Sequence, residues 1–313
     1  MTTSNSSLGM GDSPSPPVSA HTFLVGGTHE SMHNLIYGSF ACALALAMQV
    51  FACTLARMRG TGKIMEDFAG LSVIFLCTST LFIRGVFLSR QVIVTSILSV
   101  WGARLVAMHR KRPKSAYTFA SEASPSPGDL CVTRAVWAWV VSAPAILVNT
   151  LDRRATGSVF PHGHWDGIGL VCAIGGFALE WAADSQKSAW YATAPADRRT
   201  SCTQTGVWRW SRHPNYAGQL CMHLGIYVLV SQHTPWWSVI GLLFTLIALT
   251  TLDGGMMTLE RDKNIRLYSK TDFLAYRATT SPLVPMSPKL YIALHWRVKT
   301  YCLFEWSAYA AYR

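Results

Sequence analysis

The sequence predicts an all-α protein, a polytopic membrane helix bundle of about seven transmembrane helices. Three observations predict this fold class. Half of the 313 residues are hydrophobic and only 14% are charged, whereas an average soluble domain has ~25% charged residues. Seven apolar runs follow one another along the chain, and the Lys and Arg residues gather in alternate connecting segments. Intrinsic disorder of most of the chain and a disulfide-rich secreted scaffold are both excluded.

Each apolar run is close to the length that a bilayer crossing requires. About 20 apolar residues in a helix cover the hydrocarbon core, and isolated soluble core helices do not explain seven such runs in one chain. The last two runs come from a stretch without formal charge that a polar break at 231–235 divides. In chain order, the expected spans are 35–55, 68–88, 91–108, 135–151, 167–183, 216–230 and 236–257.

The distribution of basic residues predicts the orientation. Short cytosolic loops collect Lys and Arg. If the segment after the third span is cytosolic, 22 of the 27 Lys and Arg residues lie on that side, and the amino terminus lies outside. The net charge of +11 is then explained by topology and by contact with anionic membrane lipids. We expect no nucleic-acid partner. An endoplasmic reticulum membrane is the expected compartment, although a bacterial inner membrane would show the same charge bias.

The two ends of the chain differ from its centre. Residues 1–33 are rich in Ser, Pro and Gly and carry no Lys or Arg, which predicts a disordered tail. Residues 34–90 hold the first two transmembrane helices. Residues 289–313 are aromatic but also charged, which favours a segment on the membrane surface over an eighth span. The eight cysteines show no CxxC spacing, so we expect neither disulfides nor a metal site.

Charged side chains inside the predicted spans are costly and therefore suggest function. Arg104 lies in the third span. Glu180 and Asp184 lie four residues apart in the fifth, which places them on one face of a helix. An interhelical ion pair that holds the bundle together is the alternative interpretation of these charges.

The densest group of polar and aromatic residues is 206–218. Arg209, Arg212 and His213 precede Pro214, and proline favours the first turn of a helix. Basic side chains beside the free N–H groups of a helix start form an anion site, and arginine suits phosphate. Trp208, Trp210 and Tyr216 could stack on a flat ring. A basic juxtamembrane flank with an aromatic belt explains the same residues, so both interpretations stay open. Glu260 and Arg261 follow the last span, and a lid over the cytosolic mouth or a plain interfacial helix is expected after them.

Arg212-His213-Pro214-Asn215-Tyr216-x-Gly218, preceded by Gly206-x-Trp208-Arg209, resembles the signature of the steroid 5-alpha-reductase-like membrane reductases. The most similar branch is a poorly characterised one related to the steroid reductase C-terminal domain. Further matches at 101–105, 175–187, 259–260 and 276–285 occur in the same order. The resemblance covers about 90–288 and implies that 91–288 form a catalytic membrane domain.

The resemblance implies a cytosol-facing cofactor cavity and an NADPH-dependent oxidoreductase that acts on CH–CH groups. The substrate would be a carbon–carbon double bond in a sterol, steroid or other lipid. Tyr216 and Asp67 would supply the catalytic proton, although a charge that stabilises the start of a helix explains Asp67 equally well. By position, the residues that would bind NADPH are Arg104, Asp184, Trp208, Arg209, Arg212, His213, Asn215, Tyr216, Gln219, Glu260 and Arg261.

Two positions depart from the family pattern. Relatives often carry Glu where this chain has Gln219, which cannot ionise, and paired Trp where it has His223 and Leu224. A His in an apolar helix is more often a hydrogen-bonded core residue than a catalyst.

Two other functions compete with the reductase. S-adenosylmethionine-dependent membrane methyltransferases of the isoprenylcysteine or phospholipid type share Arg-His-Pro-x-Tyr-x-Gly and a Glu after the last span. That group tends to place two adjacent Glu there, whereas Arg261 follows Glu260 here. A non-enzymatic lipid-binding relative is the third possibility.

Overall fold

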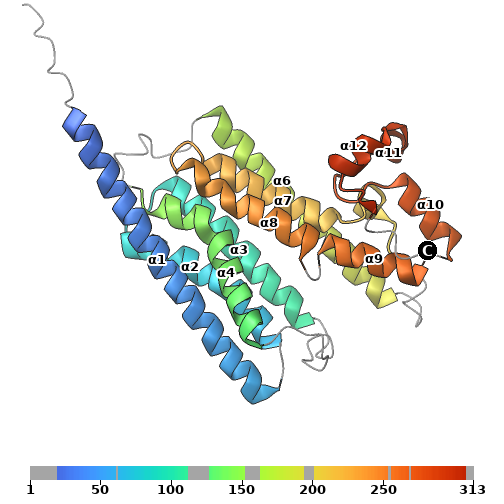
Figure 1. Ribbon diagram of the computed structural model, residues 1–313, viewed down its shortest axis with the longest axis horizontal. Helices are drawn as coiled ribbons and strands as arrows, with labels where there is room; N and C mark the ends of the chain where they lie inside the picture. Colours follow the sequence, from blue (N-terminus) through green and yellow to red (C-terminus); the bar gives the residue numbers. More distant parts are fainter. Residues whose placement is uncertain are drawn as a thin grey trace, which may run out of the picture.

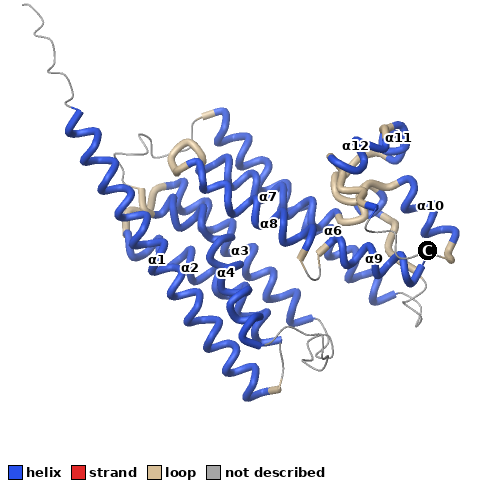
Figure 2. The backbone as a smooth tube through the Cα atoms, viewed as in Figure 1, coloured by secondary structure: helices blue, strands red, loops and turns tan. Residues whose placement is uncertain are grey.

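A computed structural model describes residues 20–60, 63–111, 127–151, 163–193, 201–252, 255–267 and 269–307. All regular secondary structure within these ranges is helical (Figure 2), as the sequence predicts. In chain order the α-helices are α1 (Ala20–Arg59), α2 (Lys63–Arg84), α3 (Ser89–Lys111), α4 (Pro127–Asn149), α6 (His164–Thr193), α7 (Pro214–Val230), α8 (Ile240–Thr251), α9 (Met256–Leu267), α10 (Thr271–Thr279), α11 (Pro288–Ala293) and α12 (Trp296–Tyr301). Two short 3₁₀ helices, η3 (Gly206–Arg209) and η4 (Trp236–Val239), precede α7 and α8.

The helices form a long bundle and a smaller lobe (Figure 1). Helices α1 to α4 pack against one another, and α7 and α8 join them through α3 and α4. Helix α6 makes its main contact with α7. The lobe contains α9 to α12 and lies at the end of the bundle where α6 ends (Figure 1). We call it the C-terminal lobe.

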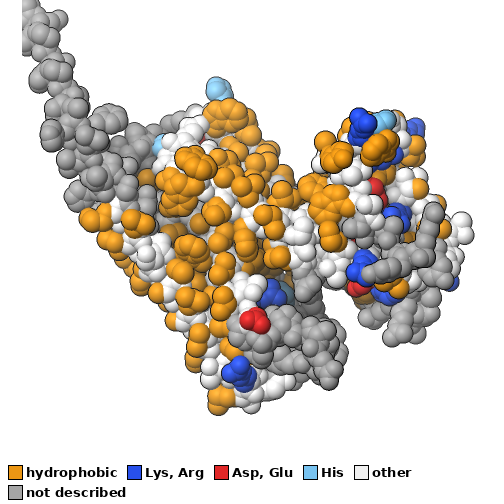
Figure 3. All heavy atoms as spheres, in the orientation of Figure 1, with side chains coloured by type: hydrophobic (Ala, Val, Ile, Leu, Met, Phe, Trp, Pro, Cys, Tyr) orange, Lys and Arg blue, Asp and Glu red, His pale blue; other side chains and the backbone are white. Residues whose placement is uncertain are grey.

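The described helices include six that are long and apolar enough to cross a membrane. They are 35–59, 64–84, 89–110, 131–149, 164–193 and 236–267. Apolar side chains cover most of the visible bundle surface, whereas several charged side chains lie on the C-terminal lobe (Figure 3). A surface of this kind suits a bundle that faces lipid, and the chain is an integral, multi-pass membrane protein.

Helix α7 corresponds to the remaining predicted span but has only 17 residues, about 25 Å at 1.5 Å per residue. It runs antiparallel to the first half of α6, because Gly218 lies against Glu180 and Gly225 lies against Ala173. This short helix therefore packs closely along the longer helix α6. The structure supports six spans by length and places α7 beside the fifth of them.

Helix α1 begins at Ala20, inside the 1–33 region that composition predicts to be disordered. Residues 20–33 lie in α1 in the structure. All of the prolines in this region lie at or before Pro17, so no proline interrupts the helix that follows. Residues 1–19 lie outside the described part of the chain.

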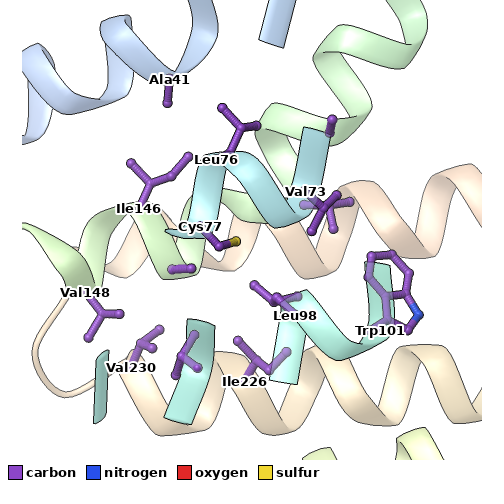
Figure 4. Packing of buried hydrophobic residues seen from close by; sticks show 14 of the residues in the cluster. Ala41, Val73, Leu76, Cys77, Leu98, Trp101, Ile146, Val148, Ile226 and Val230 are labelled. Atoms are coloured by element: carbon purple, nitrogen blue, oxygen red, sulfur yellow. The ribbon is translucent and has the colours of Figure 1, made fainter. Parts of the chain in front are cut away.

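The bundle core contains residues from α1 to α4, α6 and α7. Leu76, Leu98, Ile146 and Ile226 belong to this core (Figure 4). Glycine lets α6 and α7 approach closely, since a Cβ added at Gly176 would overlap backbone atoms of α7. Backbones in such close contact hold the start of α7 at a fixed place relative to α6.

The carboxyl-terminal residues form two six-residue helices, α11 and α12. Neither is long enough to cross a membrane. The described part of 289–313 therefore contains no helix long enough for an eighth span.

Candidate functional site

Arg104 joins α3 to α6 inside the bundle. Its Nη1 donates to Glu180 Oε1 at 2.8 Å, and its Nη2 donates to Asp184. Trp101 Nε1 donates to Glu180 Oε2 at 3.1 Å. We call Trp101, Arg104, Glu180 and Asp184 the bundle cluster. Glu180 and Asp184 share one helix face, as predicted, and the structure shows the interhelical ion pair.

The segment that precedes α7 is attached to the end of α6. Trp208 Nε1 donates to Ala183 O at 3.0 Å, and Val207 N donates to Gln186 Oε1 at 3.0 Å. Gly206 has a φ of 62° and lies against Gln186, a backbone conformation that favours glycine. Trp208 is buried and its N–H is already used, so it packs against α6 and does not offer an open stacking surface.

The stretch after α10 lies along the same segment. Arg212 N donates to Ser281 O at 2.8 Å, and Met286 N donates to Trp210 O at 3.0 Å. Tyr276 Oη donates to Trp208 O at 2.6 Å. Residues 276–286 therefore cover the start of α7, which is where the sequence predicts a lid or an interfacial helix.

A second ionic cluster lies where α7 begins. Arg212 is almost fully buried and donates to both Glu260 of α9 and Glu305. Glu260 also accepts from His213 Nε2 at 2.8 Å and from Lys263 Nζ at 3.0 Å. We call Arg212, His213, Glu260, Lys263 and Glu305 the lobe cluster. It joins the start of α7 to α9 and to the segment after α12, both in the C-terminal lobe.

His213 is neutral in this cluster. Burial lowers its pKa to about 3, Lys263 and Arg212 lower it as well, and the contact with Glu260 opposes that shift. A neutral ring still donates one N–H to Glu260. The His213 ring also stacks on Tyr216, with 5.3 Å between centroids and an interplanar angle of 24°. Pro214 is the first residue of α7, as predicted.

Unpaired polar atoms lie beside this stack. Asn215 Oδ1 and Arg212 Nε are both buried and have no hydrogen-bond partner among the described residues. Arg209 is exposed, and its guanidinium lies 5.4 Å from the ring centroid of Trp210. Arg261 is exposed as well. The start of α7 therefore combines exposed arginines, a flat aromatic pair and a buried acceptor.

The structure does not bring all of the predicted residues together. Asp67 lies on α2, with its Oδ2 3.8 Å from Arg110 Nε. Gln219 is half-buried, and its backbone carbonyl accepts from His223 Nδ1 at 2.9 Å. His223 is buried with its ring 5.1 Å from Trp101, in agreement with the interpretation as a core residue. Its Nε2 has no hydrogen-bond partner within the described ranges.

Sequence reasoning missed Trp101, Lys263, Tyr291 and Glu305 as site residues. Glu305 contacts Arg212, and Tyr291 Oη donates to Glu305 at 2.8 Å. Both belong to the aromatic carboxyl-terminal segment, where no motif marks them. Trp101 lies inside a matched motif, but its hydrogen bond to Glu180 could not be inferred from spacing.

Comparison with known proteins gives one result. A family model described as "Protein of unknown function (DUF1295)" matches residues 52–280. No significant match was found among curated proteins, and none among solved structures. The matched region contains the bundle cluster and most of the lobe cluster, and it ends before Glu305. The chain therefore belongs to the DUF1295 family, which is part of the steroid 5-alpha-reductase-like membrane superfamily.

Proposed function

We propose that the protein is an NADPH-dependent reductase of a carbon–carbon double bond in a sterol, steroid or other lipid. The cofactor would bind at the start of α7, on the cytosolic side of an endoplasmic reticulum membrane. Family membership supports a membrane enzyme of this superfamily. The residues at the start of α7 support the choice of cofactor.

The burial and hydrogen bonding of Glu260 favour NADPH over S-adenosylmethionine as the cofactor. S-adenosylmethionine is a net cation, because its sulfonium and ammonium groups outweigh its single carboxylate, so an available carboxylate at Glu260 would favour it. Glu260 has no exposed surface, and its two oxygens already accept from Arg212, His213 and Lys263. Arg261, the residue after Glu260, is exposed, and so is Arg209, three residues before Arg212. This arrangement favours an anionic ligand.

The residues at the start of α7 fit the parts of NADPH. The exposed Arg209 and Arg261 suit its phosphates, because a guanidinium can donate to two oxygens. The buried Arg212 bonds to Glu260 and Glu305 and would join them only if one of these carboxylates leaves. The buried Asn215 Oδ1 lacks a protein donor among the described residues and suits the N–H of a carboxamide. The stacked rings of His213 and Tyr216 suit a flat ring. Arg104 and Asp184 would support this site from behind, because Trp208 is bound to the adjacent Ala183.

When bound, NADPH supplies the hydride for the β carbon of a polarised double bond. The chain's own residues would then have three tasks. The phenol of Tyr216 would hydrogen-bond to the substrate oxygen or donate the proton that the α carbon requires. Arginines would hold the phosphates, and apolar walls of the bundle would exclude water and so strengthen these interactions. Asp67 lies on α2 beside Arg110, away from the start of α7, so Tyr216 is the proton donor that we propose.

Purified full-length protein in detergent tests this proposal. Thermal stabilisation by NADPH, without stabilisation by S-adenosylmethionine, is expected. The opposite pattern would support the methyltransferase, and no response to either ligand would favour a lipid-binding protein. Lipid analysis of a deletion strain would then identify the unsaturated lipid that accumulates.

A further inference from the structure

Glu305 lies where a bound anion would lie. Its Oε2 accepts from Arg212 Nη2 and, at 2.8 Å, from Tyr291 Oη. Its Oε1 lies 3.8 Å from Arg277 Nη2. Two guanidinium groups and one phenol from three separate elements thus converge on a single carboxylate. Burial and the neighbouring Glu305 carboxylate raise the pKa of Tyr291, so its phenol remains a donor.

The two carboxylates on Arg212 are held very differently. Glu260 lies within α9, has no exposed surface and binds three cationic or donor groups. The Glu305 side chain is 22% exposed and lies beyond the last turn of α12. Glu260 is built into the fold, whereas Glu305 can leave without opening a helix.

The backbone next to Glu305 is held in an unfavourable conformation. Phe304 has a φ of 62°, which a bulky residue rarely adopts. Its ring packs at 5.5 Å from Trp306, and both side chains contact the cluster around Met256 and Leu283. Strain of this kind persists only when surrounding contacts impose it.

We propose that Arg212, Arg277 and Tyr291 form a phosphate-binding cradle, and that Glu305 occupies it as an internal competitor. The carboxyl-terminal segment would have to withdraw Glu305 before a phosphate group enters. The identity of the ligand as NADPH rests on the function proposed above. The cradle itself requires only a phosphate anion, because arginine and phenol donors bind phosphate oxygens as they bind a carboxylate.

The charges around Arg212 explain why withdrawal favours an anion. With Glu305 in the cradle, three cations face two carboxylates. The cations are Arg212, Arg277 and Lys263, and the carboxylates are Glu260 and Glu305. Without Glu305, only Glu260 remains opposite three cations. Arg277 Nη1 also donates a hydrogen bond to Asn264 Oδ1 at 3.2 Å. This bond keeps the Arg277 guanidinium at the cradle.

The test compares full-length wild type with Glu305→Gln in detergent. Gln keeps the size of the side chain and removes its charge. Titration calorimetry with pyrophosphate, and separately with NADPH, should show binding that is about tenfold tighter in the variant, the scale of one lost charged hydrogen bond. Adding Arg277→Ala to Glu305→Gln should abolish this gain. Asp272→Asn is the matched control, because it removes an exposed carboxylate from the same lobe and should leave both affinities unchanged.

A second measurement uses the wild type alone. Hydrogen exchange of residues 303–307 should become faster when pyrophosphate is added, since Glu305 must leave the cradle. Unchanged pyrophosphate affinity in Glu305→Gln together with unchanged exchange would overturn the proposal, even if NADPH binds. Tighter pyrophosphate binding without any NADPH binding would leave the cradle standing and overturn the reductase.

Discussion

The bundle cluster and the lobe cluster each contain an arginine between two carboxylates, but their settings differ. Arg104 connects two long helices, and both of its acids come from α6 within one helical turn. Arg212 connects the start of α7 to α9 and to Glu305, which lie 48 and 93 residues away in sequence. The first cluster fixes packing within the bundle. The second joins the bundle to the C-terminal lobe.

Arg212→Ala should have the largest effect. It leaves the fully buried Glu260 with fewer partners, and breaking a buried ion pair costs about 3–5 kcal/mol. Thermal unfolding in detergent should show the loss, and stabilisation by NADPH should disappear. Arg209→Ala is the matched control because Arg209 is exposed. It should keep the wild-type melting temperature and weaken NADPH binding only. Equal melting temperatures for both variants would show that the lobe cluster does not hold the fold together.

Glu180→Gln should separate the two clusters. It removes one of the two carboxylate charges that pair with Arg104. The free energy of unfolding should fall by about 1.5–3 kcal/mol, the range for a hydrogen bond to a charged group. Asp184 still pairs with Arg104, so the site at the start of α7 should survive. Calorimetry should give an NADPH Kd within about twofold of wild type, as expected for independent sites. A large loss of NADPH affinity would instead place the bundle cluster in the binding site.

Gly176→Ala tests the helix pair that positions both clusters. An added Cβ would overlap the backbone of α7 around Gly218, and overpacking costs about 1–3 kcal/mol. Gly175→Ala is an ideal companion, because nothing lies within 4 Å of its added Cβ. Thermal unfolding should show destabilisation by the first substitution only. Similar melting temperatures for the two variants would contradict the close α6–α7 contact.

The pH dependence should be the smallest effect. His213 has a folded pKa of about 3, below the value of about 6.5 for an unfolded histidine. Between these values the unfolded chain binds a proton that the folded chain does not. Stability should therefore be unaffected above pH ~6.5 and fall below it by up to ~1.4 kcal/mol per pH unit. His213→Gln should show a flatter profile in unfolding measured from pH 7.5 to 5. Parallel profiles would mean that other groups cause the acid sensitivity.

Much of the fold follows from local sequence patterns. Apolar length predicts the helices that cross the bilayer, and Pro214 predicts the start of α7, because proline suits the first turn. The four-residue spacing of Glu180 and Asp184 predicts their shared face. Composition was a poorer guide at the amino terminus, where a helix begins at Ala20. The prediction there rests on Ser, Pro and Gly content over 33 residues, although every proline of this region precedes Ala20.

The sequence by itself determined which segments are apolar, which connecting segments carry the basic residues and which motif begins α7. Each of these properties depends on residues close together in the chain, so spacing and composition reveal it. Only the tertiary structure decided that Arg104 faces α6, that Glu260 already accepts hydrogen bonds from three groups, and that Glu305 pairs with Arg212. These contacts join residues tens of positions apart, and the packing of helices and lobe brings them together.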